Sequence, residues 1–149
     1  MVMLHSAVSA FPSLHHLCHA PNAAFPLLGE SVQAGFPSPA DDWLEDAIDL
    51  NQHFIKNPPA TFLMRVCGDS MRDVGILHGD IVAVDRSLQA KPGRIVVASI
   101  HGEFTIKRLS RIKGKLCLVA ENPQFAPIEL TEELEAVTVG VVVSVLRSL

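Results

Sequence analysis

The sequence has little cysteine, no basic residue before Lys56 and no hydrophobic run of bilayer length. Three widely spaced cysteines, Cys18, Cys67 and Cys117, form neither a disulfide framework nor a CxxC metal site, so we expect a reducing cytoplasmic compartment. An N-terminal region without positive charge lacks the first feature of a secretory signal peptide. The longest apolar run, residues 137–146, is shorter than the roughly 20 residues that span a bilayer, which predicts a soluble protein with no membrane partner.

The length and composition of the chain indicate one compact globular domain with an additional arm. The chain has 149 residues, of which 48% are hydrophobic and 19% are charged. Its formal net charge of −4 gives the whole molecule no general attraction for nucleic acid phosphates or anionic membranes. We therefore expect no direct sequence-specific DNA binding, and expect any DNA contact to be local or through a partner.

Residues 1–34 differ from the rest and are interpreted as an N-terminal arm. They hold four of the seven histidines and a single charged residue, Glu30, and no helical or strand period continues through them, which indicates mostly irregular structure. Residues 15–19 include zinc-binding residue types, but adjacent ligands without a second cluster are interpreted as an incidental His-rich segment, so no metal is expected. The two prolines within residues 35–39 break regular structure, which predicts a domain boundary near Gly35.

The remaining sequence predicts one short helix followed by strands. Five carboxylates and no basic residue lie between Asp41 and Asp49, a pattern that suits a helix N-terminus. The apolar residues among them share one helical face. We therefore predict a helix that continues to Ile55 and ends before Pro58-Pro59. Six β-rich runs follow, at 61–67, 80–85, 94–100, 103–109, 115–119 and 137–146. His101-Gly102 predicts a tight hairpin between two of them. The expected fold is mainly β, with twisted antiparallel sheets, a short helix and an irregular arm.

A candidate nucleophile lies in the turn after the first predicted strand. Gly68-Asp69-Ser70-Met71 would leave the hydroxyl of Ser70 exposed at a strand end, although a serine there can also serve only to form the turn. A nucleophilic serine needs a base, and a His/Asp triad would use His78 or His101, which both lie in predicted turns. The other possible base is a lysine kept neutral by desolvation, a role that arginine cannot take because it stays charged.

Lys107 is the lysine that lies in the middle of an apolar strand. Strand alternation places it on one face with Thr105 and Leu109, while Phe104 and Ile106 point to the other face. Those two apolar residues therefore do not desolvate it, and a cover must come from elsewhere, for example from the apolar arm. The alternative is a solvated charge in a basic stretch of the sequence.

Several groups of residues occur in one order and with a spacing typical of a known family. They are Val32 to Ala40, Ile48 to Gln52, Gly68 to Met71 with Asp73, Gly75, Ile76, Gly79 and Asp80, Gly102 to Lys107, and Asn122, Phe125, Pro127 and Ile128. Together they cover about residues 30–149. The sequence thereby resembles the LexA-like family of serine/lysine self-cleaving proteins, peptidase family S24, and within it the SOS mutagenesis branch.

The resemblance implies the LexA-like peptidase fold and a serine endopeptidase activity directed at the chain itself. It implies that Ser70 is the nucleophile and that Lys107 is the general base, which later protonates the leaving amine. The cut would lie between Ala34 and Gly35, and the backbone N–H groups of Asp69 and Ser70 would form the oxyanion hole. No cofactor is implied.

The same resemblance implies a regulated reaction and several partners. RecA filaments on single-stranded DNA, formed after DNA damage, would act as coprotease for the cleavage. The cut would separate the arm, residues 1–34, from the peptidase and dimerisation domain, residues 35–149. That product would form a homodimer and join the UmuC-like catalytic subunit of an error-prone translesion DNA polymerase.

Three alternative functions are weighed against this hypothesis. A LexA-like transcriptional repressor needs a helix-turn-helix domain before the cut, and the 34 residues before Gly35 contain no base. A Ser/Lys signal peptidase needs a membrane anchor, which the hydrophobic pattern does not predict. A non-catalytic polymerase-binding module has no need for Ser70, Lys107 and Ala34-Gly35 together.

Overall fold

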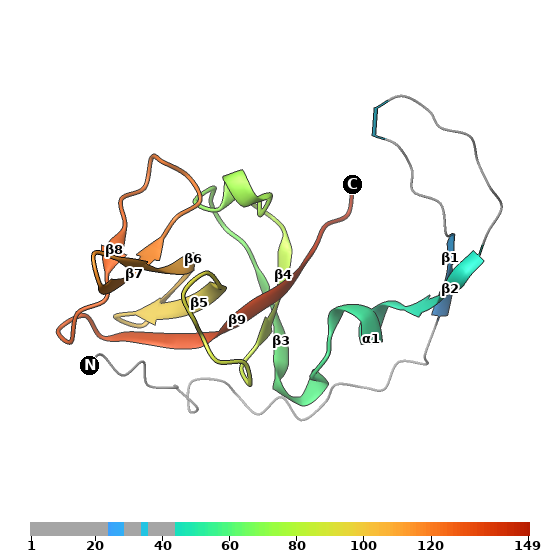
Figure 1. Cartoon of the computed structure of the whole chain (residues 1–149), viewed down its shortest axis with the longest axis horizontal. Helices are drawn as coiled ribbons and strands as arrows, with labels where there is room; N and C mark the ends of the chain where they lie inside the picture. Colours follow the sequence, from blue (N-terminus) through green and yellow to red (C-terminus); the bar gives the residue numbers. More distant parts are fainter. Residues whose placement is uncertain (1–23, 29–33, 36–43) are drawn as a thin grey trace. The chain divides into compact units, whose positions relative to one another are not determined.

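The computed structural model describes residues 24–28, 34–35 and 44–149, which belong to two compact units (Figure 1). The larger unit contains residues 57–149 and holds the main sheet. The smaller unit contains the described residues from 24 to 56. No helix in the described residues is long and apolar enough to cross a membrane.

A seven-stranded antiparallel sheet forms the larger unit. Its strands are β3 (Thr61–Arg65), β4 (Ile81–Asp85), β5 (Ile95–Ile100), β6 (Glu103–Ile112), β7 (Lys115–Val119), β8 (Ile128–Glu129) and β9 (Ala136–Leu146), in the spatial order β3-β4-β9-β5-β6-β7-β8. The prediction of a mainly β fold is confirmed, and six of these strands coincide with the β-rich runs. The two-residue strand β8 has no such run. Two short 3-10 helices, η1 (Pro58–Ala60) and η2 (Arg72–Val74), complete this unit.

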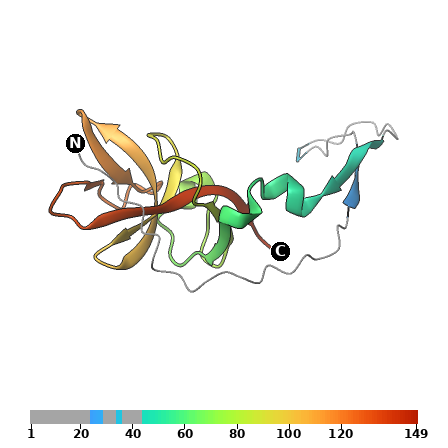
Figure 2. The same cartoon turned by 90° about the horizontal axis from the view of Figure 1, so that it is seen from below.

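The long strand β9 joins the two halves of the sheet (Figures 1 and 2). Its first half pairs with β5 and its second half pairs with β4, and Val141 has a partner in both strands. The C-terminal strand of the larger unit therefore lies inside the sheet, between β4 and β5, and joins its two halves.

The two faces of the sheet contribute to two separate apolar clusters. One contains Phe62, Val66, Met71, Ile76, Val82, Val84, Val97 and Val139. The other contains Val96, Ala98, Leu109, Leu118, Leu130 and Val141. Val96 and Val97 are neighbours in β5 but belong to different clusters, because successive side chains of a strand point to opposite faces. This explains why β5 is a continuous apolar run in the sequence.

Two tight turns connect β5, β6 and β7. The predicted hairpin at His101-Gly102 is confirmed, with φ of 48° and 83° at the two central residues, the positive values that a type I′ turn requires. Lys113-Gly114 makes the same kind of turn between β6 and β7, with φ of 49° and 82°. These turns fix the register of β6, the strand that holds Lys107.

The smaller unit contains β1 (Ala24–Leu28), β2 (Leu44–Asp49) and the helix α1 (Leu50–Phe54). The helix predicted from residue 41 is wrong over residues 44–49, which form a strand antiparallel to β1, and residues 41–43 lie outside the described residues. The expected arm likewise contains a strand, at β1. Asp49 explains where the helix starts, since its Oδ1 accepts the N–H groups of Asn51 (2.9 Å) and Gln52 (3.3 Å) as an N-cap.

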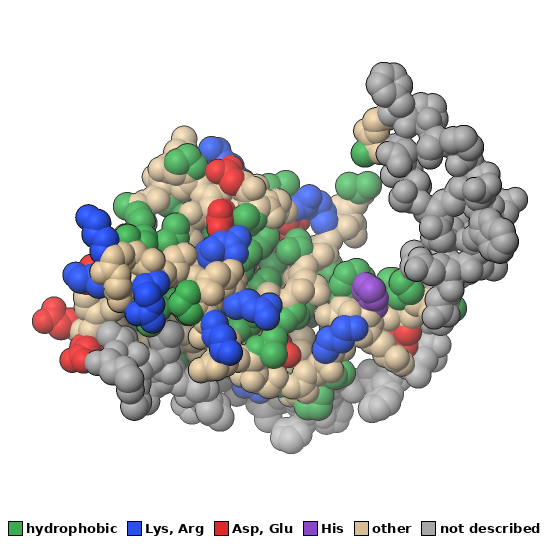
Figure 3. Space-filling model, in the orientation of Figure 1, with side chains coloured by type: hydrophobic (Ala, Val, Ile, Leu, Met, Phe, Trp, Pro, Cys, Tyr) green, Lys and Arg blue, Asp and Glu red, His purple; other side chains and the backbone are tan. Residues whose placement is uncertain are grey.

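Charge is unevenly distributed over the chain. All 12 lysines and arginines lie at or after Lys56, and basic side chains predominate on the face of the larger unit seen in Figure 3. The net charge of −4 is therefore an average, and it does not describe this face.

Gly140 lies in β9 where that strand passes β4 most closely. A Cβ there would lie 2.7 Å from Cγ1 of Val84 and 2.9 Å from the carbonyl oxygen of Asp85. Because the backbone atoms cannot move without disturbing the pairing of β9, we expect Gly140→Ala to destabilise the fold by about 1–3 kcal/mol. Urea unfolding followed by circular dichroism measures the loss. Val143→Ala, at a partly exposed position of the same strand, is the control, and an equal or smaller loss for Gly140→Ala would contradict the close approach.

Candidate active site

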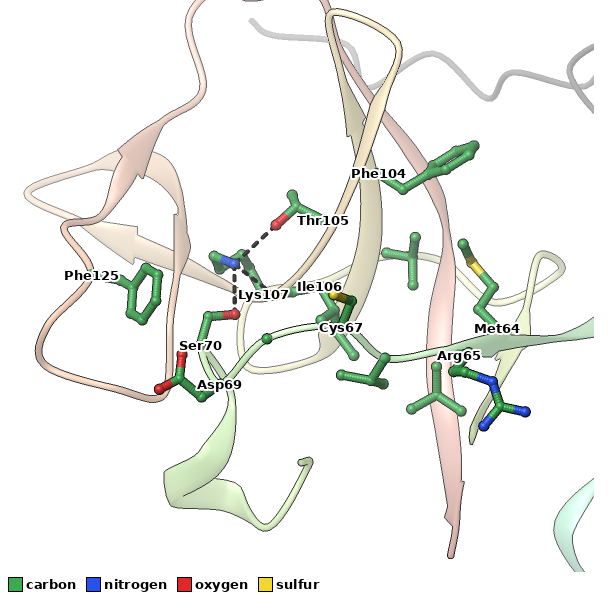
Figure 4. A pocket seen from close by; sticks show the side chains of 14 residues that line it. Met64, Arg65, Cys67, Asp69, Ser70, Phe104, Thr105, Ile106, Lys107 and Phe125 are labelled. Atoms are coloured by element: carbon green, nitrogen blue, oxygen red, sulfur yellow. Dashed lines mark hydrogen bonds between the residues drawn. The ribbon is translucent and has the colours of Figure 1, made fainter. Parts of the chain in front are cut away.

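A cleft of about 320 Å³ opens on the larger unit (Figure 4). Its walls come from the end of β3, the turn that follows β3, the first half of β6 and the loop between β7 and β8. The lining residues are Met64 to Ser70, Val82, Val97, Phe104 to Lys107 and Phe125. The cleft therefore contains both Ser70 and Lys107, the residues singled out in the sequence.

Ser70 and Lys107 are in direct contact in this cleft. Nζ of Lys107 lies 2.9 Å from Oγ of Ser70, although the two residues are 37 positions apart in the sequence. Nζ also donates to Oγ1 of Thr105 at 2.9 Å and to the carbonyl oxygen of Ile106 at 3.0 Å. A neutral amine has two N–H donors and one lone pair. Two acceptors besides Ser70 thus satisfy both donors and leave the lone pair directed at the serine hydroxyl.

Lys107 is buried, with only 8% of its surface exposed. The interpretation of Lys107 as a solvated charge is therefore wrong. Its cross-strand neighbour is Val96, and it shares its face with Leu109, so it borders the second apolar cluster. The ring of Phe125 lies 6.0 Å from Nζ. Burial lowers the pKa of Lys107 from its ordinary value, because water no longer stabilises the charged amine.

The predicted alternation along β6 is confirmed by these contacts. Thr105 lies on the Lys107 side, where its Oγ1 accepts a hydrogen bond from Nζ, whereas Phe104 points away from Nζ in Figure 4. The cover that the alternation requires comes from the second cluster and from Phe125. Of the arm that the sequence offered for this purpose, residues 1–34, the structure describes only residues 24–28 and 34, which belong to the smaller unit.

The turn that contains Ser70 is held from two sides. Residues 66–80 form a closed loop, since Val66 N–H donates to the carbonyl oxygen of Asp80 and Gly79 N–H donates to that of Val66, each at 2.8 Å. From the other side, the buried side chain of Asn122 donates through Nδ2 to the carbonyl oxygen of Asp69 at 3.0 Å. The hydroxyl of Ser70 is thus presented by a turn with fixed neighbours.

His78, one of the two alternative bases, has a different contact. Its Nδ1 accepts a hydrogen bond from the backbone N–H of Gly68 at 3.1 Å. This bond joins the two ends of the 66–80 loop. His101 occupies the β5–β6 turn, and no hydrogen bond links either histidine to Ser70 among the described residues. The geometry therefore pairs the serine with lysine and not with histidine.

Ala34 and Gly35 lie in the smaller unit, between β1 and β2. Both residues are exposed. In the sequence they lie between Leu28 of β1 and Leu44 of β2, which pair with each other. A Cβ at Gly35 would have no atom within 4 Å. The His-rich residues 15–19 lie outside the described residues, and the described part of the chain has no group of three or more metal-binding side chains.

Sequence reasoning missed the ion pair that closes the loop beneath Ser70. Both carboxylate oxygens of the buried Asp80 accept from Arg147, at 2.6 Å each, and Oδ2 also accepts the N–H of Leu77 at 2.7 Å. Arg147 further donates to the carbonyl oxygen of Gly75. Asp80 belongs to a motif of the resemblance, but Arg147 lies 67 positions away and has no local signal.

The ion pair makes the fold sensitive to acid. Hydrogen bonds from Arg147, then from Leu77, lower the pKa of Asp80 from 3.8 to about 2. The folded state thus favours the carboxylate, so its contribution to stability is complete above about pH 4 and is lost as the pH falls towards 2. We expect Asp80→Asn to reduce stability at neutral pH and to flatten its decline between pH 4 and 2. Thermal unfolding across this range measures both effects, with the exposed Glu103→Gln as control. An unchanged decline in Asp80→Asn would contradict the assignment.

Comparison with known proteins agrees with this geometry. Residues 26–143 match the family described as Peptidase S24-like. The chain is 44% identical over 110 residues to Protein SamA of Salmonella typhimurium, which covers 74% of this chain and 77% of SamA. It is 46% identical over 101 residues to Protein ImpA of Escherichia coli, which covers 67% of this chain and 70% of ImpA. A LexA repressor of Pseudomonas putida is 45% identical over 129 residues, or 86% of this chain and 63% of the repressor.

Proposed function

This chain belongs to the Peptidase S24-like family of self-cleaving serine peptidases, and from that membership we propose that Ser70 and Lys107 are its catalytic dyad. The observation that carries the proposal is the 2.9 Å contact between Oγ of Ser70 and Nζ of a buried Lys107. A buried lysine can be neutral at moderate pH, and only the neutral amine can accept the serine proton.

The proposed reaction begins with a proton transfer within the dyad. Neutral Lys107 takes the proton of Ser70 while its own N–H groups stay bonded to Thr105 and Ile106. Oγ then attacks the carbonyl carbon of Ala34. The backbone N–H groups of Asp69 and Ser70 donate to no other described residue, which supports their proposed role as donors to the developing oxyanion.

Collapse of the tetrahedral intermediate breaks the bond between Ala34 and Gly35. The protonated Lys107 gives its proton to the leaving amine of Gly35 and becomes neutral again. Water then attacks the acyl group on Ser70, with Lys107 accepting a proton from the water and returning one to Oγ. The scissile bond is part of the same chain, so tethering supplies the effective concentration that a separate substrate would need to obtain by binding.

The finer biological setting is also a proposal. Likeness to SamA and ImpA supports a UmuD-like role in SOS mutagenesis, in which RecA filaments on single-stranded DNA stimulate the cut. Residues 35–149 would then form a homodimer and join a UmuC-like subunit of a translesion DNA polymerase. Incubation with RecA, an ATP analogue and single-stranded DNA tests the first step, since it should increase the yield of a fragment that begins at Gly35.

Substitution of the dyad should stop cleavage without unfolding the protein. We expect Ser70→Ala, Lys107→Ala and Lys107→Arg each to lower the cleavage rate by at least about 100-fold, because arginine cannot act as a base at ordinary pH. Mass spectrometry of the fragment that begins at Gly35 gives the rate. Lys115→Arg, at an exposed lysine that pairs with Glu129, is the matched control and should cleave normally. Cleavage of Lys107→Arg at the wild-type rate would refute the general-base role.

The pH dependence of RecA-independent cleavage distinguishes a lysine base from a histidine base. A lysine starts from a pKa near 10.4, and burial lowers this value, so the neutral fraction of Lys107 grows as the pH rises towards its lowered pKa. We expect the rate to be low at neutral pH and to increase through the alkaline range. A histidine base would reach its plateau by about pH 8. Rates are measured from pH 6 to 11 with Ser70→Ala as blank, and a flat profile above pH 8 would exclude the lysine.

A further inference from the structure

The segment from Asn122 to Phe125, between β7 and β8, bonds to Asp69, the neighbour of Ser70, and lies beside Lys107. Asn122 reaches the turn of Ser70 through the carbonyl oxygen of Asp69, and the ring of Phe125 faces Nζ of Lys107. In Figure 4, Phe125 and Phe104 stand on opposite sides of Lys107. One short segment therefore links the nucleophile turn to the surroundings of the base.

Hydrogen bonds hold this segment in a fixed shape. The side chain of Asn122 is 2% exposed, and its Oδ1 accepts the N–H of Gln124 at 3.0 Å. The carbonyl oxygen of Asn122 accepts the N–H of Phe125 at 3.1 Å, and the carbonyl oxygen of Glu121 accepts the N–H of Asp73 at 3.0 Å. The placement of Phe125 is thus set by the same residue that fixes the turn of Ser70.

Phe125 closes the side of Lys107 that the other contacts leave open. Ser70, Thr105 and Ile106 take the polar contacts of Nζ, and Val96 of β5 is the cross-strand neighbour of the lysine. The phenyl ring is 42% exposed, so one part of it lies towards the amine and another part lies in solvent. Such a ring can exclude water from the amine although no backbone element covers it.

Two effects of the ring on Lys107 oppose each other. A phenyl face attracts an ammonium ion and would favour the charged form, but the 6.0 Å separation is at the outer limit of that attraction. Exclusion of water favours the neutral form. Burial is the cause that lowers the pKa of Lys107, so the neutral form is the one that its surroundings favour.

We propose that Phe125, anchored by Asn122, is a positioning residue that covers Lys107 and thereby keeps part of the general base neutral. The inference rests on the proposed function of the dyad and adds a residue that touches none of the reacting atoms. Its effect should appear in the pH dependence of the cut rather than only in its rate.

The test measures RecA-independent cleavage of the full-length chain from pH 6 to 11 for three variants. Phe125→Ala admits water to the amine, and we expect the half-maximal pH to rise by about 0.5–1 and the rate at pH 8 to fall by about 3–10-fold. Phe125→Leu keeps an apolar cover without an aromatic face and should stay near the wild-type half-maximal pH.

Phe104→Ala is the matched control, because it removes a similarly exposed phenyl ring that lines the same cleft but points away from Nζ. It can change the rate through contact with the substrate segment, but its half-maximal pH should match that of the wild type. Thermal unfolding of each variant verifies the fold, which a partly exposed position is expected to tolerate.

The outcomes separate this inference from the proposed function. A wild-type profile without an alkaline rise would overturn the lysine base itself. A normal wild-type profile with an unchanged or lowered half-maximal pH in Phe125→Ala would overturn only the role of Phe125. An equal rise in Phe125→Ala and Phe125→Leu would show that an apolar side chain at this position is not what keeps the amine neutral, and would also overturn the cover.

Discussion

The contact between Ser70 and the buried amine of Lys107 is the constraint on which the site depends. A lysine amine next to an apolar cluster costs free energy when it is charged, and that cost decreases when the amine is neutral and hydrogen-bonded. Thr105, Ile106 and Ser70 supply those bonds. The same arrangement that makes burial of the lysine tolerable places its amine against the hydroxyl of Ser70, so in the proposed mechanism stability and reactivity have one structural origin.

The fold brings this contact about through elements far apart in the sequence. β6 carries the lysine, and its register follows from two tight turns with positive φ. The serine is fixed by a loop that Asp80 closes, and Asp80 is held by Arg147, which follows the interior strand β9. The position of the nucleophile therefore depends on the end of the strand that also joins the two halves of the sheet.

Sequence patterns predicted the sheet better than they predicted the site. Six strands follow from runs of β-branched residues because burial on two faces needs such residues throughout. The helix predicted over 41–49 failed because pairing with β1 satisfies the backbone of residues 44–49, which no local pattern reveals. For the site, alternation correctly placed Thr105 beside Lys107, and the turn offered Ser70 as a candidate. The pairing of Ser70 with Lys107 came from family resemblance, since contact between distant residues leaves no trace in the spacing of either.

A lysine base has a consequence for an enzyme whose substrate is its own chain. Tethering raises the effective concentration of the bond, so a fully active nucleophile would cut soon after folding. Burial lowers the pKa of the amine, and the proportion of neutral, reactive dyads decreases as the pH falls below that lowered pKa. In the proposed function, the protonated fraction of Lys107 slows unassisted cleavage, so the uncut chain persists. An activating partner can then increase the cleavage rate. In this proposal, the cover over Lys107 determines the neutral fraction of the amine and thereby the rate of unassisted cleavage. The contact with Ser70 determines how readily a neutral amine takes the serine proton.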